Sequence, residues 1–313
     1  MLSAAVFKTN PFYKPFVIAC FWILFFFLTT SSPLLAGEPT RQPVIAGSWY
    51  PAEPAALRKQ ITGFLENVKT SPQVENLVSI IVPHAGYRYS GQVAAHGYRL
   101  LENRSFQTVV VVGPSHRAVF KGVSVYDRGG YKTPLGIVPI DRKIIEEIKQ
   151  TDPGIRYVYK AHAMEHCIEI QLPFIKMLLP NARLVPLLMG DQQYETCLKL
   201  ADTLARCIRG KSALLVASTD LSHFHPYHEA KKLDARVLQR VEEMDPVGLY
   251  SDLKKGISEA CGGGPMVAVM LASRLLGVNV SRVLFAANSG DVTGDRSQVV
   301  GYMAAALWVK SKK

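Results

Sequence analysis

The sequence predicts a single-domain α/β sandwich, with helices flanking a central, mostly buried mixed sheet. Short β-branched runs alternate along the chain with longer segments of helical periodicity, which is the order found in α/β folds. The strand-like runs are almost continuously apolar, as in 108–113 (TVVVVG) and 213–218 (ALLVAS), and such runs are typical of strands buried on both faces. The composition, 48% hydrophobic and 19% charged, excludes a disordered or low-complexity chain.

The predicted elements follow one another along the chain. Strands are expected, in chain order, at 78–82, 108–113, 122–126, 183–189, 213–218, 283–287 and 299–305. Helices are expected at 54–68, 90–101, 141–150, 162–179, 194–208, 226–243 and 265–276. The first helix follows PAEP and carries Leu57, Ile61 and Leu65 at helical spacing. The fourth contains Pro173, where a kink or a restart is expected because proline cannot donate a backbone hydrogen bond.

The N-terminal segment is predicted to lie outside this domain. Residues 15–37 carry no charged side chain, and a basic segment precedes them. A basic segment, an apolar run and then small residues are typical of a secretory signal, with cleavage expected after Ala36. The uncharged stretch is also long enough for an uncleaved anchor. We therefore expect 1–36 to be a signal peptide or membrane anchor, 37–313 to be the domain, and the protein to be exported (periplasmic or secreted) or membrane-anchored.

Charge and motif content exclude several classes of function. The net charge of +11 is dispersed, without a run of five or more Lys or Arg residues, so nucleic-acid binding is not expected. The GxGxxG, P-loop, HExxH and GxSxG motifs are absent from the sequence, and with them the usual nucleotide, zincin and hydrolase signatures. Cys20 lies in the N-terminal segment, and the remaining cysteines are too few for a disulfide scaffold.

Three histidines follow predicted strands closely. His84 stands in PHAGY, His116 in PSH and His223 in TDLSH, each directly after an apolar run. Ligands of open α/β sheets bind outside the carboxyl ends of the strands. A single histidine there is most simply a hydrogen-bonded loop side chain. Three at equivalent positions indicate a site, and metal binding is the first interpretation because histidine is the commonest metal ligand.

A cysteine in a glycine-rich segment is the next candidate. Cys261 stands in ACGGGP, just before a helix expected to begin at Pro265. Its thiol is a candidate soft metal ligand, nucleophile or redox group, and the helix N-terminus is expected to lower its pKa. The alternative is a helix-entry turn in which the cysteine is incidental.

Further polar residues accompany these candidates. His162, His166 and Glu169 are spaced to share one face of the expected helix, where they would orient a metal histidine or contact a substrate. A polar helix edge is the simpler alternative. Asp220, three residues before His223, is placed to hold an imidazole or to take a proton. Tyr87 either lines a pocket or covers the end of a strand.

An ordered set of motifs resembles the Memo family, whose microbial members are called AmmeMemoRadiSam system protein B. The set is AGSWYP (46–51), PHAGYRYSG (83–91), GPSH (113–116), EHCIEIQLPF (165–174), STDLSH (218–223), ACGGGP (260–265) and SGDVTGD (289–295). The resemblance covers about residues 42–308. It implies the fold of the class III extradiol, protocatechuate 4,5-dioxygenase-like enzymes, which hold a mononuclear non-haem iron by two His and one Glu. It also implies a functional link to the other AmmeMemoRadiSam proteins.

The resemblance also implies roles for individual residues. His84 and His116 match the two metal histidines, and Cys261 stands where Memo proteins have cysteine and the dioxygenases have glutamate. His223 matches the dioxygenase acid/base histidine, and Asp220 the aspartate that accompanies it. Because a thiolate makes the site softer than a carboxylate does, the implied cofactor is iron or copper.

We therefore expect a Memo-like metal-binding protein, a non-haem iron or copper redox protein or oxidoreductase acting on a small molecule or peptide. The expected metal ligands are His84, His116 and Cys261, the catalytic residues His223 and Asp220, and the substrate-binding residues Tyr87, His166 and Glu169. Two alternatives stay open: a non-catalytic peptide- or anion-binding module using the same pocket, and a zinc-type hydrolase. Contact with a membrane is expected only through an uncleaved N-terminal segment.

Overall fold

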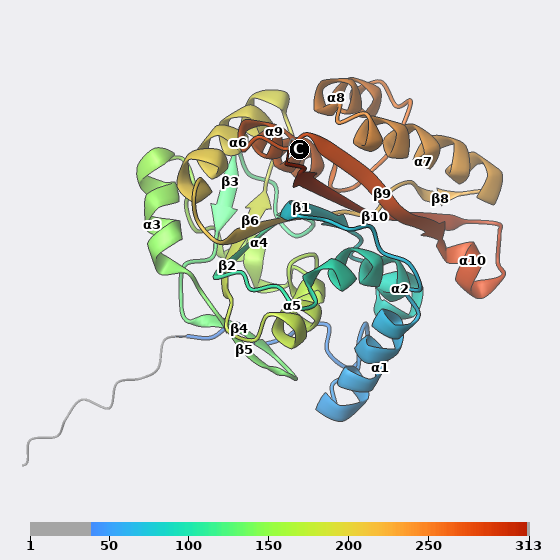
Figure 1. Cartoon of the computed structure of the whole chain (residues 1–313), viewed down its shortest axis with the longest axis horizontal. Helices are drawn as coiled ribbons and strands as arrows, with labels where there is room; N and C mark the ends of the chain where they lie inside the picture. The colour runs from blue at the N-terminus through green and yellow to red at the C-terminus, as the bar shows by residue number, and fades with distance from the viewer. Residues whose placement is uncertain (1–38, 312–313) are drawn as a thin grey trace, which may run out of the picture. The chain divides into compact units, whose positions relative to one another are not determined.

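The computed structural model of the protein describes residues 39–311, and all of these lie in one compact unit. The expected signal or anchor at 1–36 lies outside the described residues. Figure 1 shows strands in the middle of the unit and helices around them. The main sheet has eight strands in the order β3-β6-β2-β7-β1-β10-β8, with β9 pairing with β10. Both parallel and antiparallel pairs occur, so the predicted α/β fold with a central mixed sheet is confirmed.

The middle of the sheet is parallel and buried. Its neighbouring strands are β6 (Arg183–Met189), β2 (Thr108–Pro114), β7 (Ala213–Ser218) and β1 (Asn76–Val82). All side chains of β2 are buried, which explains why its sequence is continuously apolar instead of alternating. The parallel arrangement brings the carboxyl ends of these strands to one edge of the sheet.

Antiparallel strands extend the sheet on both sides. They are β3 (Val123–Val125) next to β6, and β10 (Val299–Val309) between β1 and the pair β8 (His223–His225) and β9 (Val280–Asn288). A separate two-stranded sheet consists of β4 (Gly130–Thr133) and β5 (Gly136–Pro139). The sequence pattern did not predict β4, β5 or β8, because each has at most four residues and carries little periodicity.

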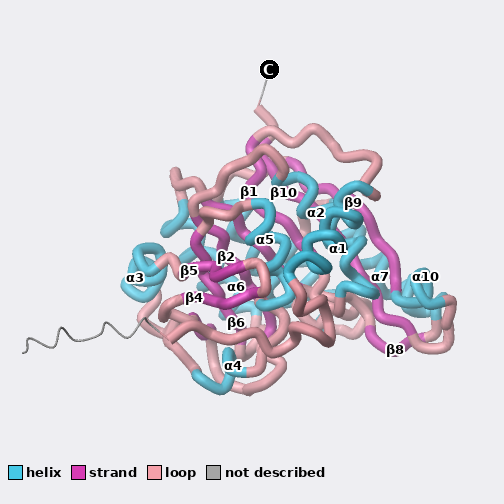
Figure 2. Tube along the Cα trace, turned by 90° about the horizontal axis from the view of Figure 1, so that it is seen from below, coloured by secondary structure: helices cyan, strands magenta, loops and turns pink. Residues whose placement is uncertain are grey.

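Helices cover both faces of the sheet, as Figures 1 and 2 show. One face carries α3 (Arg142–Thr151), α6 (Tyr194–Ile208), α8 (Pro246–Lys254) and α9 (Gly263–Leu275). The other carries α1 (Pro54–Glu66), α2 (Tyr87–Tyr98) with the short η1 (Arg99–Leu101), and α5 (Leu172–Leu178). The remaining helices are α4 (Tyr159–Ala163), η2 (Glu169–Gln171), α7 (Tyr227–Glu242) and α10 (Ser289–Thr293). Between residues 39 and 311, the helices fall short of the length and apolar character that a membrane span requires.

The helix predicted at 162–179 is wrong as a continuous element. The structure has α4 up to Ala163, turns through 164–168, then η2 and α5. The interruption has a local cause, because the Glu165 carboxylate accepts hydrogen bonds from the backbone N–H groups of His166 and Cys167. These donors would otherwise serve a helix, so His162, His166 and Glu169 do not share one helix face.

A close contact at the end of β2 gives a testable prediction. A Cβ atom added to Gly113 would overlap Sγ of the buried Cys167. We expect Gly113→Ala to lower the free energy of unfolding by about 1–3 kcal/mol, because overpacking forces a buried side chain from its place. Urea unfolding measures the change. Gly63→Ala in α1 is the matched control, since nothing lies within 4 Å of its added Cβ. A Gly113→Ala protein as stable as the wild type would contradict this packing.

Candidate metal centre

The candidate site lies where the parallel strands end. Strands β2, β7 and β1 are neighbours in the sheet, so the segments that follow them leave from the same edge. His84 follows β1, His116 follows β2, and Asp220 follows β7. His223 opens the short strand β8 just beyond. The rings of His84 and His116 are 5.1 Å apart, and His223 is near enough for its charge to act on His84.

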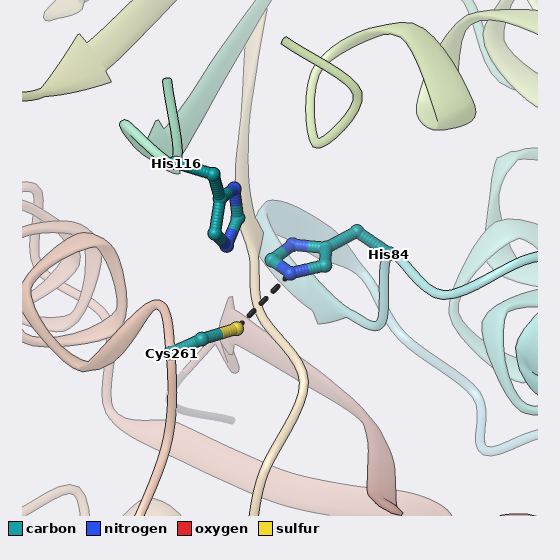
Figure 3. A group of neighbouring side chains, drawn as sticks. All are labelled: His84, His116 and Cys261. Atoms are coloured by element: carbon teal, nitrogen blue, oxygen red, sulfur yellow. Dashed lines mark hydrogen bonds between the residues drawn. The ribbon is translucent and has the colours of Figure 1, made fainter. Parts of the chain in front are cut away.

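The thiol of Cys261 completes this group, as Figure 3 shows. One donor atom each from His84, His116 and Cys261 can be chosen so that all lie within 4.8 Å of one another. Sγ of Cys261 lies 3.0 Å from Nε2 of His84, and the two imidazole centroids are 5.1 Å apart. The predicted meeting of two imidazoles and one thiol from distant parts of the chain is confirmed.

Asp220 holds the two segments that carry His84 and Cys261. Its carboxylate oxygen Oδ1 accepts hydrogen bonds from the backbone N–H groups of His84 (2.7 Å) and Ala85 (3.2 Å). Its backbone carbonyl accepts from Cys261 N at 3.2 Å, and its backbone N–H donates to Cys261 Sγ at 3.3 Å. The next residue, Gly262, has no room for a side chain, because an added Cβ would lie 2.6 Å from the Ser218 carbonyl oxygen. The end of β7 therefore sets the position of both candidate ligands, His84 and Cys261.

Hydrogen bonds determine which nitrogen of His84 faces the centre. Its Nδ1 lies 3.2 Å from Oγ of Ser218. That hydroxyl donates its own proton to the carbonyl of Cys167 at 2.7 Å, so it acts as the acceptor toward His84. Nδ1 therefore carries the imidazole proton, and the lone pair of Nε2 faces Cys261.

His116 has the same arrangement with a stronger acceptor. Its Nδ1 lies 2.9 Å from Oε1 of Glu165, which is buried. A carboxylate can only accept, so Nδ1 carries a proton, and in the neutral imidazole the lone pair is on Nε2. Burial alone would raise the pKa of Glu165, but the hydrogen bond and charge of His116 lower it to about 2.

The electrostatic environment favours a neutral imidazole at His84 and a protonated thiol at Cys261. Burial, and then repulsion from His116, lower the pKa of His84 to about 3. Burial, and then the negative charge of Asp220, raise the pKa of Cys261 to about 12. The expectation that this pKa is lowered is therefore wrong, because burial and the neighbouring Asp220 raise it. A metal ion that binds here must displace the thiol proton.

His223 and Asp220 lie beside the centre. Nδ1 of His223 is 2.8 Å from the Leu221 carbonyl, to which it must donate, so Nε2 is free to accept a proton. Burial raises the pKa of Asp220 to about 6, against the hydrogen bond from the His84 backbone. The proton-transfer roles expected for these two residues stay predictions.

His166 is the one residue of the expected substrate-binding set that lies at the centre. Its ring stands between Trp49 (centroids 4.7 Å apart) and His116 (4.5 Å), and 5.3 Å from the ring of His84. Its Nδ1 is buried and has no hydrogen-bond partner. Trp49 also lies at the site, and the sequence predicts no role for it. Its place in the AGSWYP motif is the feature that could have indicated it.

Tyr87 and Glu169 lie elsewhere, and their surroundings do not support the expected substrate contact. Tyr87 is 2% exposed, and its hydroxyl donates to the Ile170 carbonyl inside an aromatic cluster. The Glu169 side chain is fully buried, and its oxygens accept from Arg41, Tyr50 and backbone N–H groups. Both residues stabilise the segment that follows Glu165: Glu169 lies within it, and Tyr87 contacts it from α2.

The family model and the sequence relatives point to one group. A family model described as Memo-like protein matches residues 41–306. A MEMO1 family protein of Methanothermobacter thermautotrophicus is 40% identical over 271 residues, covering 84% of this chain and 98% of that protein. One from Methanocaldococcus jannaschii is 37% identical over 281 residues, covering 85% and 98%. Among solved structures, an uncharacterized protein from Escherichia coli K12 matches with a TM-score of 0.46 and 14% identity, covering 74% of this chain and 100% of that one.

Proposed function

The chain belongs to the Memo family, and from this premise we propose that His84, His116 and Cys261 bind one iron or copper ion in a redox protein or oxidoreductase. The observation that carries the proposal is the convergence of two imidazole Nε2 lone pairs with one thiol. Both Nδ1 atoms are occupied by other acceptors, so each imidazole is already turned with its ligating nitrogen inward. Such outer hydrogen bonds are the usual support of metal-bound histidines.

The donor set fits such an ion. The donor atoms lie within 4.8 Å of one another. Metal–nitrogen bonds of about 2.1 Å and metal–sulfur bonds of about 2.3 Å are compatible with such separations. Burial holds His84 neutral, and a neutral imidazole is the ligating form. Imidazoles suit both iron and copper, and the thiolate of Cys261 favours a soft ion such as copper(I). The three residues leave open positions around an ion for a further ligand.

We assign proton transfer and substrate contact to residues around His84, His116 and Cys261. A bound iron or copper ion would contribute one-electron chemistry and open coordination positions for a substrate. Nε2 of His223 is the group that we assign to proton transfer, because Nδ1 is tied to the Leu221 carbonyl. The rings of Trp49 and His166 are neighbours next to the centre, tilted by 54° to one another, and we assign them to the wall that a substrate would contact. Oxidation with O2, as in the extradiol dioxygenases, is part of the proposal.

The setting of this activity is also proposed. The charge pattern of residues 1–36 supports an exported or membrane-anchored protein. Family membership supports a functional link to the other AmmeMemoRadiSam proteins. The substrate class that we propose is a small molecule or a peptide.

Metal analysis of the protein purified without oxygen tests the proposal. We expect about one iron or copper ion per chain, together with measurable O2 consumption or electron transfer. His84→Ala and Cys261→Ser each remove one donor and are expected to weaken metal binding at least about tenfold. His228→Ala, at an exposed histidine, and Cys207→Ser, at a cysteine of α6, are the matched controls and are expected to keep the metal.

Other results of these measurements would indicate a different donor set or a different function. Full metal retention in both ligand variants would contradict the assigned donor set. A chain that binds zinc and hydrolyses esters or peptides would be a hydrolase instead. A chain that binds no metal but holds an anionic ligand with salt-sensitive affinity would be a binding module.

A further inference from the structure

Glu165 is the most heavily engaged carboxylate near the centre. Its Oε2 accepts from the backbone N–H of His116 at 2.7 Å, and its Oε1 lies 2.9 Å from Nδ1 of the same residue. Oε1 also accepts from the backbone N–H groups of His166 (2.9 Å) and Cys167 (3.1 Å). One carboxylate therefore holds both the main chain and the side chain of His116, with the turn at 164–168 wrapped around it.

The main chain of Glu165 is itself fixed from the other side by Arg41. The guanidinium of Arg41 donates to the Glu165 carbonyl at 2.6 Å and to the His162 carbonyl at 2.7 Å. It also forms a buried ion pair with Glu169 at 2.8 Å. Glu165 thus stands on a segment that is anchored by groups with no contact to His116.

His116 needs such a support more than His84 does. The His84 side chain is 2% exposed, whereas the His116 side chain is 29% exposed and sits on a loop beyond β2. An exposed imidazole interconverts between tautomers and rotates, and each of these motions would turn a protonated nitrogen toward the centre. A buried carboxylate acceptor at Nδ1 removes that freedom.

We propose that Glu165 is a positioning residue that fixes the tautomer and the orientation of His116, so that the Nε2 lone pair of His116 faces Cys261 and His84. The effect of Glu165 on metal affinity rests on the function proposed above. The tautomer of His116, however, can be observed in the metal-free chain. Arg41 and backbone N–H groups fix the position of Glu165, and Glu165 in turn fixes the position of His116.

A second cation site is the main rival explanation of the same residues. His116, Glu165 and His166 also offer donor atoms within 4.8 Å of one another. However, the carboxylate oxygens already accept four N–H groups, three of them from the backbone. A cation would have to displace the Nδ1 proton of His116 and compete with these donors. We therefore favour the positioning role, and the number of bound ions separates the two.

Nitrogen-15 NMR of the metal-free protein tests the proposal directly. We expect the His116 imidazole of the wild type to be the tautomer protonated on Nδ1, with its signals assigned by their absence in His116→Ala. In Glu165→Gln this preference is expected to be lost, and the affinity for added iron(II) or copper(I) to fall about 10–100-fold. Asp141→Asn is the matched control: it alters a buried carboxylate that accepts from Thr108, at the opposite end of β2 from His116, and from the backbone of Ile144. It is expected to keep both the tautomer and the affinity.

The outcomes distinguish this proposal from the one on which it builds. A neutral wild-type His116 that carries its proton on Nε2 instead of Nδ1 would overturn it without any variant, even if Glu165→Gln failed to fold. Unchanged metal affinity in a folded Glu165→Gln protein, or two ions per chain with one lost in that variant, would overturn it as well. A protein with the expected tautomer that takes up no metal would contradict only the proposed function.

Discussion

Replacing Arg41 by methionine is expected to lower the free energy of unfolding by about 3–5 kcal/mol, because it leaves a buried carboxylate without its counter-ion. The side chains of Arg41 and Glu169 are 6% and 0% exposed, and their atoms are 2.8 Å apart. Arg41 also donates to the carbonyls of His162 and Glu165, which would lose this partner. Methionine is about as long as the aliphatic part of the arginine side chain. The decrease in the free energy of unfolding therefore measures the loss of the guanidinium charge and its hydrogen bonds.

Chemical denaturation measures this loss, and a surface pair provides the comparison. Arg99 and Glu102 form a pair at 2.5 Å whose side chains are 36% and 32% exposed. Arg99→Met is expected to cost less than about 1 kcal/mol, since water screens such pairs. The double variant Arg41→Met, Glu169→Gln is expected to recover part of the loss, because no unpaired charge remains. A loss in Arg41→Met no larger than in Arg99→Met would contradict the role of this ion pair.

The architecture and the grouping of the two histidines could be predicted from local sequence. Continuous apolar runs mark strands such as β2 and β7 because both of their faces are covered, and the histidines follow those runs directly. Parallel strands end at one edge, so residues far apart in sequence meet there. Cys261 could be added by its glycine-rich segment and by the resemblance to the Memo family.

The roles of residues 162–171 could not be predicted, because their partners lie far away in the chain. Glu169 has the spacing of a site residue, but its partner Arg41 is 128 positions away. Periodicity carries no information about such a pairing. From the sequence alone, a glutamate in a buried ion pair cannot be told from one on the polar edge of a helix. Glu165 was missed for the same reason: its hydrogen bonds to the loop of His116 exist only after β2 and the 164–168 turn come together.

The pKa of Cys261 shows a second limit of sequence reasoning. A helix N-terminus and flanking glycines indicate an accessible thiolate, but the segment is packed against the end of β7. Desolvation and Asp220 raise the pKa to about 12, and neither can be read from ACGGGP. Under the proposed function, this thiol would have to lose its proton when it binds a metal ion.

Exchanging this sulfur for a carboxylate is expected to reverse the metal preference of the centre. Cys261→Asp replaces a soft donor by a hard one while the two imidazoles stay in place, each held through Nδ1. We expect the ratio of copper(I) affinity to iron(II) affinity to fall on the order of 100-fold, since thiolates select copper(I) and carboxylates suit iron(II). Competition between the two ions under anaerobic conditions, followed by elemental analysis, measures the ratio.

The controls separate a change of donor from a change of fold. Cys207→Ser alters a cysteine of α6 that is no part of the group, and its ratio is expected to equal that of the wild type. Cys261→Ala removes the donor without replacing it, so it is expected to weaken both ions and not only copper(I). If Cys261→Asp kept the wild-type ratio, sulfur would not be a ligand, and the Sγ–Nε2 contact of 3.0 Å would be only a hydrogen bond between a thiol and an imidazole.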